Sequence, residues 1–198
     1  MSRKQSKARG RSGKSGMVRI IGGSWRGRRL PVADVPGLRP SGDRSRETLF
    51  NWLQAELPGA RVADLFAGTG VLGFEAVSRG AAGAVLIEQD RDAVRVLSGS
   101  VAALDAQSRV EVSEGDALAW LKNRAAGSLD IVFADPPFGA GLARPVLEAL
   151  RTCPALRTGG LVYLETARDA GLQGLPRGWE VVREKVLGEV RMQLLQKI

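Results

Sequence analysis

The chain has 198 residues, 44% hydrophobic and 25% charged, which suits one globular domain with a core of its own. One cysteine and no histidine exclude an intramolecular disulfide, a Ser-His-Asp triad and a histidine zinc site. The net charge of +8 is uneven, because residues 1–30 hold ten Lys or Arg and no acidic residue, whereas the rest holds 19 basic and 21 acidic residues. This asymmetry indicates a polyanionic partner, with nucleic acid ahead of a membrane.

The N-terminal segment divides into a tail and an extension. Residues 1–16 offer almost nothing to bury, which predicts a disordered basic tail, either a nucleic-acid arm or a segment that only aids solubility. Residues 17–33 place a glycine-rich turn, 22–27, between two β-prone runs, which predicts a β-hairpin. We therefore assign residues 17–40 to a small N-terminal β-hairpin extension.

A helix is predicted next, within residues 41–57. Leucine recurs there every four positions, at 49, 53 and 57, as expected for one buried helical face. Ser41 or Asp43 can cap the start of this helix, and Pro58-Gly59 is expected to end it.

Strand-like and helical runs alternate from residue 61 onward, which predicts βαβ units and a mostly parallel sheet with helices on both faces. The strand-like runs are 62–66, 84–88, 110–113, 131–134 and 161–165, and the helical stretches lie near 71–79, 90–104, 116–124 and 141–151. Residues 179–186 and 190–196 predict a C-terminal antiparallel hairpin. The expected fold class is thus α/β, with a Rossmann-like, seven-stranded sheet in a domain of residues 41–198.

A glycine-rich turn follows the first strand of this domain. Gly68, Gly70 and Gly73 match GxGxxG, a pattern that also occurs in βα turns without a ligand. Glu88 ends the next strand 20 residues on, where a carboxylate can accept ribose hydroxyls. Asp64 interrupts an otherwise apolar strand end, which suits a ligand with a cationic amino-acid end better than a pyrophosphate.

A second motif, Asp135-Pro136-Pro137-Phe138, directly follows the strand-like run 131–134. Two prolines end a strand and stiffen the turn at its carboxyl end, where open α/β sheets bind ligands. A carboxylate acceptor beside an aromatic face can hold a flipped base and its exocyclic amine. The alternative is a proline-rich loop with a solvated aspartate.

Together these motifs resemble class I S-adenosylmethionine-dependent amino-methyltransferases. More narrowly, the chain resembles the RsmD family of bacterial 16S rRNA guanine-N2 methyltransferases, from residue 18 nearly to the C-terminus. The resemblance rests on residues 19–23, 39–53, 64–70 and 135–138, of which RPSGDRSRETLFNWL at 39–53 is the most specific. The tail of residues 1–16 lies outside it.

The resemblance implies S-adenosylmethionine as cofactor, no metal, and a role for each motif. Asp135 and the Pro136 carbonyl would accept hydrogen bonds from the guanine amine, Pro137 would stiffen the turn, and Phe138 would stack on the base. The cofactor would be bound by Asp64, Phe66, Ala67, Gly68, Thr69, Gly70, Glu88, Gln89, Asp116 and Ala117. Asp116 would meet the adenine amine, although it can equally cap a helix over 117–124.

The implied partner is 16S ribosomal RNA, either free or within a small-subunit particle, and we expect a cytoplasmic monomer that contacts no membrane. No apolar run approaches the roughly 20 residues of a membrane helix, and a single cysteine is typical of a reducing compartment. The expected RNA-binding residues are Arg26, Arg28, Arg29, Arg39, Arg44 and Arg46. Arg39, Arg44, Arg46 and Glu47 would lie at the cofactor pocket or RNA entrance, or form ion pairs on a surface helix.

Three other functions are compatible with parts of the pattern. A DNA adenine-N6 methyltransferase shares the Pro-Pro-aromatic motif, but the chain lacks room for a target-recognition domain. A nicotinamide-dependent oxidoreductase would explain GxGxxG and Glu88, but leaves residues 135–138 without a role. A non-catalytic RNA-binding assembly factor would not need Gly68 and Asp135.

Overall fold

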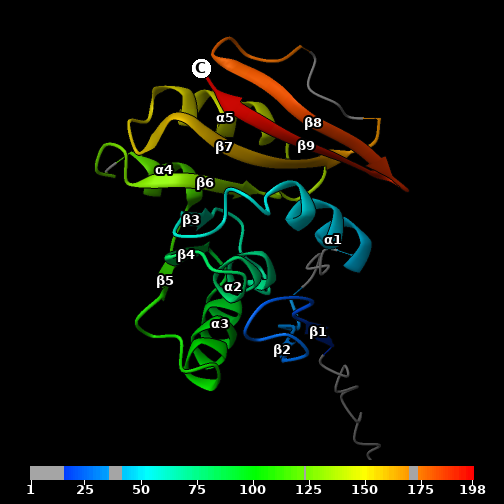
Figure 1. Cartoon of the computed structure of the whole chain (residues 1–198), viewed down its shortest axis with the longest axis vertical. Helices are drawn as coiled ribbons and strands as arrows, with labels where there is room; N and C mark the ends of the chain where they lie inside the picture. The colour runs from blue at the N-terminus through cyan, green and yellow to red at the C-terminus, as the bar shows by residue number, and fades with distance from the viewer. Residues whose placement is uncertain (1–15, 36–41, 123, 170–173) are drawn as a thin grey trace, which may run out of the picture.

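The computed structural model describes residues 16–35, 42–122, 124–169 and 174–198 (Figure 1). Several predictions fall outside these ranges: residues 1–15 of the predicted tail 1–16, the capping candidate Ser41, the RNA candidate Arg39 and the proposed domain boundary at residue 40. Within them, no helix is long and apolar enough to span a bilayer.

The N-terminal hairpin forms as predicted. Strand β1 (Met17–Arg19) pairs antiparallel with β2 (Arg29–Pro31), and the chain turns between them through residues 20–28. The hairpin packs on helix α2 (Val71–Ser78), where the Ser24 and Trp25 amides donate to the Ser78 carbonyl and hydroxyl at 2.7 and 2.8 Å. The extension therefore shares a hydrophobic core with the main domain.

Helix α1 (Asp43–Trp52) corrects two predictions. Asp43 is not the cap, because Gly42 occupies that position in an extended conformation and the Asp43 carboxylate pairs with Arg46 instead. The helix also ends before Pro58. Leu53 has φ −92° and ψ 2°, and a turn follows in which the Leu57 amide still donates to the Leu53 carbonyl at 3.0 Å. That turn keeps both leucines buried without a continuous helix.

The main sheet has the strand order β5-β4-β3-β6-β7-β9-β8, which confirms the predicted fold class. Strands β3 to β7 are parallel, and β8 and β9 form the antiparallel C-terminal hairpin. The strands are β3 (Arg61–Asp64), β4 (Gly83–Glu88), β5 (Val110–Glu114), β6 (Leu129–Ala134), β7 (Leu156–Ala167), β8 (Trp179–Leu187) and β9 (Val190–Lys197). The remaining helices are α3 (Arg91–Ala103), α4 (Ala117–Leu121) and α5 (Ala143–Thr152).

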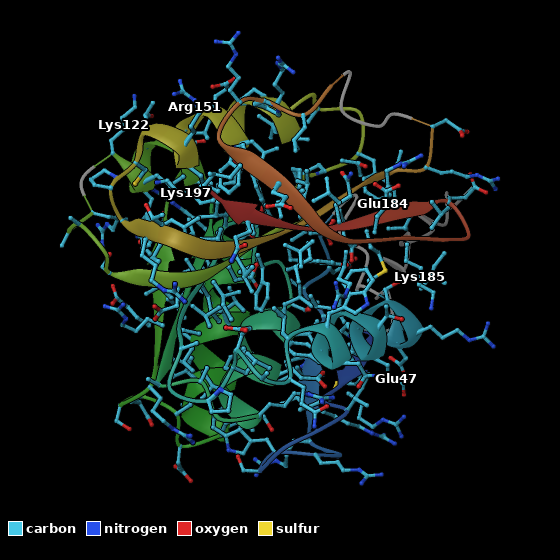
Figure 2. The ribbon with its side chains drawn as sticks, turned by 45° about the horizontal axis from the view of Figure 1, so that its top comes forward. Glu47, Lys122, Arg151, Glu184, Lys185 and Lys197 are labelled. Atoms are coloured by element: carbon cyan, nitrogen blue, oxygen red, sulfur yellow. The ribbon has the colours of Figure 1, made fainter. Side chains whose placement is uncertain are left out.

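Two hydrophobic clusters cover the two faces of the sheet. The first joins the hairpin, α1, α2 and α3, and includes edge-to-face contacts of Phe133 with Phe50 and Tyr163 at 6.1 and 6.4 Å. The second packs α4 and α5 on the other face. Lys197 (Figure 2) ties β9 to the end of α5 by donating to three carbonyls, those of Leu150, Cys153 and Leu156.

The order of the strands fixes where a ligand can bind. β3 pairs with β4 on one side and with β6 on the other. The strands from β3 to β5 therefore follow one another toward one edge of the sheet, and those from β6 onward lie toward the other edge, so the strand order reverses between β3 and β6. Open α/β sheets bind ligands at the carboxyl ends of the strands at such a point. The segments after β3 and β6 are the glycine-rich turn and Asp135-Pro136-Pro137-Phe138.

Candidate active site

Acidic residues lie at the carboxyl end of five neighbouring parallel strands. Asp64 ends β3, Glu88 ends β4, and Asp116 follows β5 by two residues. Asp135 directly follows β6, and Glu165 lies near the end of β7. The structure thus brings together the carboxylates of the predicted site and adds Glu165, which was not predicted.

The glycine-rich turn connects β3 to α2 around the Asp64 carboxylate. Gly68 and Gly70 have φ of 52° and 71°, which side chains rarely adopt, and a Cβ on Gly70 would approach Leu97 to 2.6 Å. Asp64 is 1% exposed, and its Oδ2 accepts a hydrogen bond from the Gly73 amide at 3.3 Å. The glycine-rich turn therefore holds its own backbone close to the buried Asp64 carboxyl group.

The Glu88 carboxylate fixes the same turn from the neighbouring strand. Its Oε2 accepts from the Gly68 amide at 2.8 Å, and its Oε1 accepts from the Gln89 and Asp90 amides at 2.8 and 2.9 Å. The side chain is half-buried. Glu88 thus lies at the predicted position, while its contact with a ribose stays a prediction.

The electrostatics around Asp64 favour a cationic ligand. The pKa of the Asp64 carboxyl is raised to about 7, mainly by burial and in part by the negative charges of Asp135 and Glu88, while the hydrogen bond from the Gly73 amide opposes the rise. A positive charge placed among these carboxylates would favour the ionised form of Asp64 and offset the energetic cost of burying its charge. The donor set therefore fits a ligand with an ammonium or sulfonium group.

The segment after β6 forms the lip of the site. Asp135 is half-buried and Pro136 buried, whereas Phe138 is 51% exposed. The ring of Phe138 thus offers an apolar face to a flat molecule from outside.

Asp116 caps a helix, which is one of the two roles that the sequence allowed for it, the other being contact with the adenine amine. It is the N-cap of α4, and its Oδ1 accepts from the Ala119 amide at 2.8 Å. The residue is exposed, and Ala117 behind it is buried. A contact of Asp116 with an adenine stays a prediction.

The predicted RNA-binding arginines divide into exposed and buried groups. Arg26, Arg28 and Arg29 are exposed on the hairpin, and Arg28 also donates to the Ala103 carbonyl at the end of α3 at 2.5 Å. Arg44 is exposed on α1, as is Glu47, which Figure 2 shows on the outer side of that helix. These residues are available to a partner.

Arg46 corrects the prediction of an RNA contact, because it is 0% exposed. Its guanidinium pairs with Glu75 at 2.8 Å and with Asp43 at 2.6 Å, and donates to the Arg19 carbonyl at 2.8 Å. Glu75 is also 0% exposed, pairs with Arg79 at 2.7 Å and accepts from the Gly22 amide at 3.1 Å. Arg46 and Glu75 thus join α1, α2 and the hairpin.

Sequence reasoning missed two buried pairs of polar residues. Glu75 stands in the otherwise apolar run Val71–Ser78, and a charge in such a run signals a buried ion pair. Glu165 ends a strand-like run as Glu88 does, and Tyr163 donates a hydrogen bond to it. The signal available in the sequence was that Glu165, like Glu88, stands at the end of a strand-like run.

The fold and the strand-end site define a class I methyltransferase. Among the described residues, no three His, Cys, Asp or Glu side chains are arranged to hold a metal ion. The chain was predicted to carry three features of this class: the acidic strand ends, the glycine-rich turn and the Asp-Pro-Pro-Phe segment after β6.

Comparisons with known proteins agree with that class. The family described as Conserved hypothetical protein 95 matches residues 18–196. Ribosomal RNA small subunit methyltransferase D of Escherichia coli is 46% identical over 92% of this chain and 91% of its own length. The protein of the same name from Haemophilus influenzae is 41% identical over 91% and 94%. The solved structure of yhhF from Escherichia coli has a TM-score of 0.82 at 44% identity, over 92% of this chain and 98% of its own.

The chain therefore belongs to the RsmD family, as its motifs indicated, and it is a methyltransferase.

Proposed function

We propose that this protein transfers the methyl group of S-adenosylmethionine to the exocyclic N2 amine of a guanine in small-subunit ribosomal RNA. The observation that carries the proposal is the convergence of Asp64, Glu88 and Asp135 at adjacent strand ends, with Phe138 exposed at the lip. The names of its relatives support ribosomal RNA of the small subunit as the substrate class.

The residues around the glycine turn would hold the cofactor, which when bound supplies an electrophilic methyl group on a sulfonium. Asp64 would offset the positive charge at its amino-acid end, and Glu88 would accept hydrogen bonds from its ribose hydroxyls. Phe66, Ala67, Gly68, Thr69 and Gly70 would form the backbone cradle. Gln89, Asp116 and Ala117 would surround the adenine end.

The residues after β6 would orient the guanine. Asp135 and the Pro136 carbonyl would accept hydrogen bonds from the amine, which turns the nitrogen lone pair toward the methyl group. Phe138 would stack on the base after it has left the RNA helix. Because the amine proton becomes strongly acidic once the N–C bond forms, these residues need supply only proximity, orientation and electrostatic stabilisation.

The exposed arginines would bind the RNA backbone. Arg26, Arg28 and Arg29 lie on the hairpin and Arg44 on α1, and both elements pack against α2, which begins at the glycine turn. Arginine suits phosphate because its fork of donors matches two phosphate oxygens. The hairpin and α1 would thus hold RNA near the strand ends.

The proposal is tested by two measurements on the purified protein. Calorimetry should detect binding of S-adenosylmethionine but not of NAD. Labelled S-adenosylmethionine should then transfer label to small-subunit ribosomal RNA, free or in a particle, but not to adenine in duplex DNA. NAD binding, or label in DNA adenine alone, would contradict the proposal.

Replacing Glu88 with alanine should weaken S-adenosylmethionine binding by at least about tenfold. A charge-assisted hydrogen bond contributes roughly 1.5–3 kcal/mol, and about 1.4 kcal/mol corresponds to a tenfold change in Kd. Glu114→Ala is the matched control, because Glu114 is the register partner of Glu88 on β5 and is exposed. Equal affinities of the two variants in calorimetry would refute the ribose contact.

Asp64 should make cofactor affinity depend on pH. Its pKa of about 7 means that the carboxyl is partly protonated in the free protein at neutral pH. A cationic ligand prefers the ionised form, so affinity should rise as pH increases from about 5.5 to 7.5 and the proton is lost. Calorimetry over this range measures the slope, which Asp64→Asn should remove. An equal slope in both proteins would show that another group titrates.

A further inference from the structure

A buried pair of side chains lies beside the proposed guanine site and has no role in the steps above. Tyr163 and Glu165 are 0% and 4% exposed on β7, and the Tyr163 hydroxyl donates a hydrogen bond to Glu165 Oε1. In the parallel pairing of β6 with β7, Phe133 stands opposite Tyr163 and Ala134 opposite Leu164. Asp135 directly follows the last of these pairs, and its negative charge acts on the Glu165 carboxyl, so the two carboxyl groups lie near each other.

The surroundings of Glu165 favour its neutral form. The pKa of this carboxyl is raised to about 8, mainly by burial and in part by the negative charge of Asp135, while the hydrogen bond from Tyr163 opposes the rise. On β9, the register partner of Glu165 is Met192, an apolar and fully buried side chain. Two adjacent carboxylates in such a setting share one proton rather than both ionise.

We propose that Glu165 is a positioning residue for methyl transfer, which in its protonated form holds the Asp135 carboxylate in the orientation that receives the guanine amine. Tyr163 fixes the rotamer of Glu165 through its hydroxyl. The inference rests on the proposed role of Asp135. When Glu165 ionises, its charge repels Asp135 and the orientation is lost, so kcat falls while the cofactor site, which lies around β3 and β4, is unaffected.

The pH profile of kcat at saturating S-adenosylmethionine, measured for the wild type and two variants, tests this inference. In the wild-type protein kcat should fall as pH rises past about 8. Glu165→Gln keeps the size and the acceptor oxygen but cannot ionise, so it should keep kcat near neutral pH and lose the alkaline fall. Tyr163→Phe removes the bond that lowers the pKa of Glu165, so the fall should move to higher pH.

Glu165→Leu measures the size of the effect. It removes the polar contact at every pH and should lower kcat roughly 10- to 100-fold, the loss expected when a reacting group is misplaced by about 1 Å. The Kd for S-adenosylmethionine should not change. Glu184→Gln is the matched control, because Glu184 lies on the edge strand β8 (Figure 2). The pH profile of kcat of Glu184→Gln should match that of the wild type. Titration of the RNA itself affects the wild type and all variants equally, so it cannot produce a difference between them.

The outcomes separate this inference from the proposed function. If the wild type methylates RNA and Glu165→Gln keeps the same alkaline fall, or loses as much activity as Glu165→Leu, the positioning role is refuted. If the wild type binds S-adenosylmethionine but methylates no RNA at any pH, the proposed function fails, and this inference fails with it.

Discussion

Replacing Asp135 with alanine should lower the rate of methyl transfer by roughly 10²- to 10³-fold, the effect of removing one orienting hydrogen-bond partner. Affinity for S-adenosylmethionine should stay within a few-fold, because Glu88 and the glycine turn are held by hydrogen bonds that do not involve Asp135. Single-turnover kinetics with small-subunit RNA measure the rate, and calorimetry measures the affinity.

Asp169→Ala is the control for this variant, because it removes a carboxylate whose side chain is 92% exposed. Its rate should equal that of the wild type. Wild-type turnover in Asp135→Ala would show that the assigned contact with the guanine amine is wrong. A large loss of cofactor affinity would instead assign Asp135 to the cofactor site.

Replacing Glu75 with glutamine should lower the free energy of unfolding by about 3–5 kcal/mol, because it removes the fully buried carboxylate that pairs with the buried Arg46 guanidinium, whereas the Asp43 carboxylate that also pairs with Arg46 is 57% exposed. Glutamine keeps the size of the side chain, so the loss in the free energy of unfolding measures the contribution of the Glu75 charge. Arg79 can turn to solvent, because its side chain is 23% exposed, whereas Arg46 is fully buried. Denaturant unfolding measures the change.

Glu148→Gln provides the comparison, since Glu148 forms an exposed helical pair with Arg151, whose side chain is labelled in Figure 2. That variant should lose less than about 1 kcal/mol. A double variant, Arg46→Met with Glu75→Leu, removes both buried charges and should recover much of the loss. Equal small losses for Glu75→Gln and Glu148→Gln would mean that the buried pair does not hold the hairpin and α1 in place.

The sequence was sufficient to predict the sheet and most of the strand-end carboxylates. Apolar runs bounded by glycine or proline mark β3, β4 and β6, and the carboxyl ends of parallel strands share one edge. Asp64, Glu88 and Asp135 could therefore be placed at one edge of the sheet from the sequence alone. The hairpin was found in the same way, from a glycine-rich turn between two short runs.

The errors have a common physical cause, which is partners distant in the sequence. Arg46 looks like a surface charge because nothing near it in the chain shows that it is buried against Glu75, 29 residues away on another helix. The end of α1 was misplaced because the turn at Leu53 keeps the leucine spacing of a helix. Glu165 was overlooked because Asp135, whose charge acts on it, follows a different strand, β6.

Mass mapping of ribosomal RNA from cells with and without the gene tests the central claim most directly. One guanine of the small-subunit RNA should carry a single methyl group on N2 in the presence of the gene and lose it in its absence. Reintroducing the wild-type gene should restore the methyl group, and the Asp135→Ala variant should not. An unchanged small-subunit RNA, or a methyl group lost only from large-subunit RNA or DNA, would contradict the account.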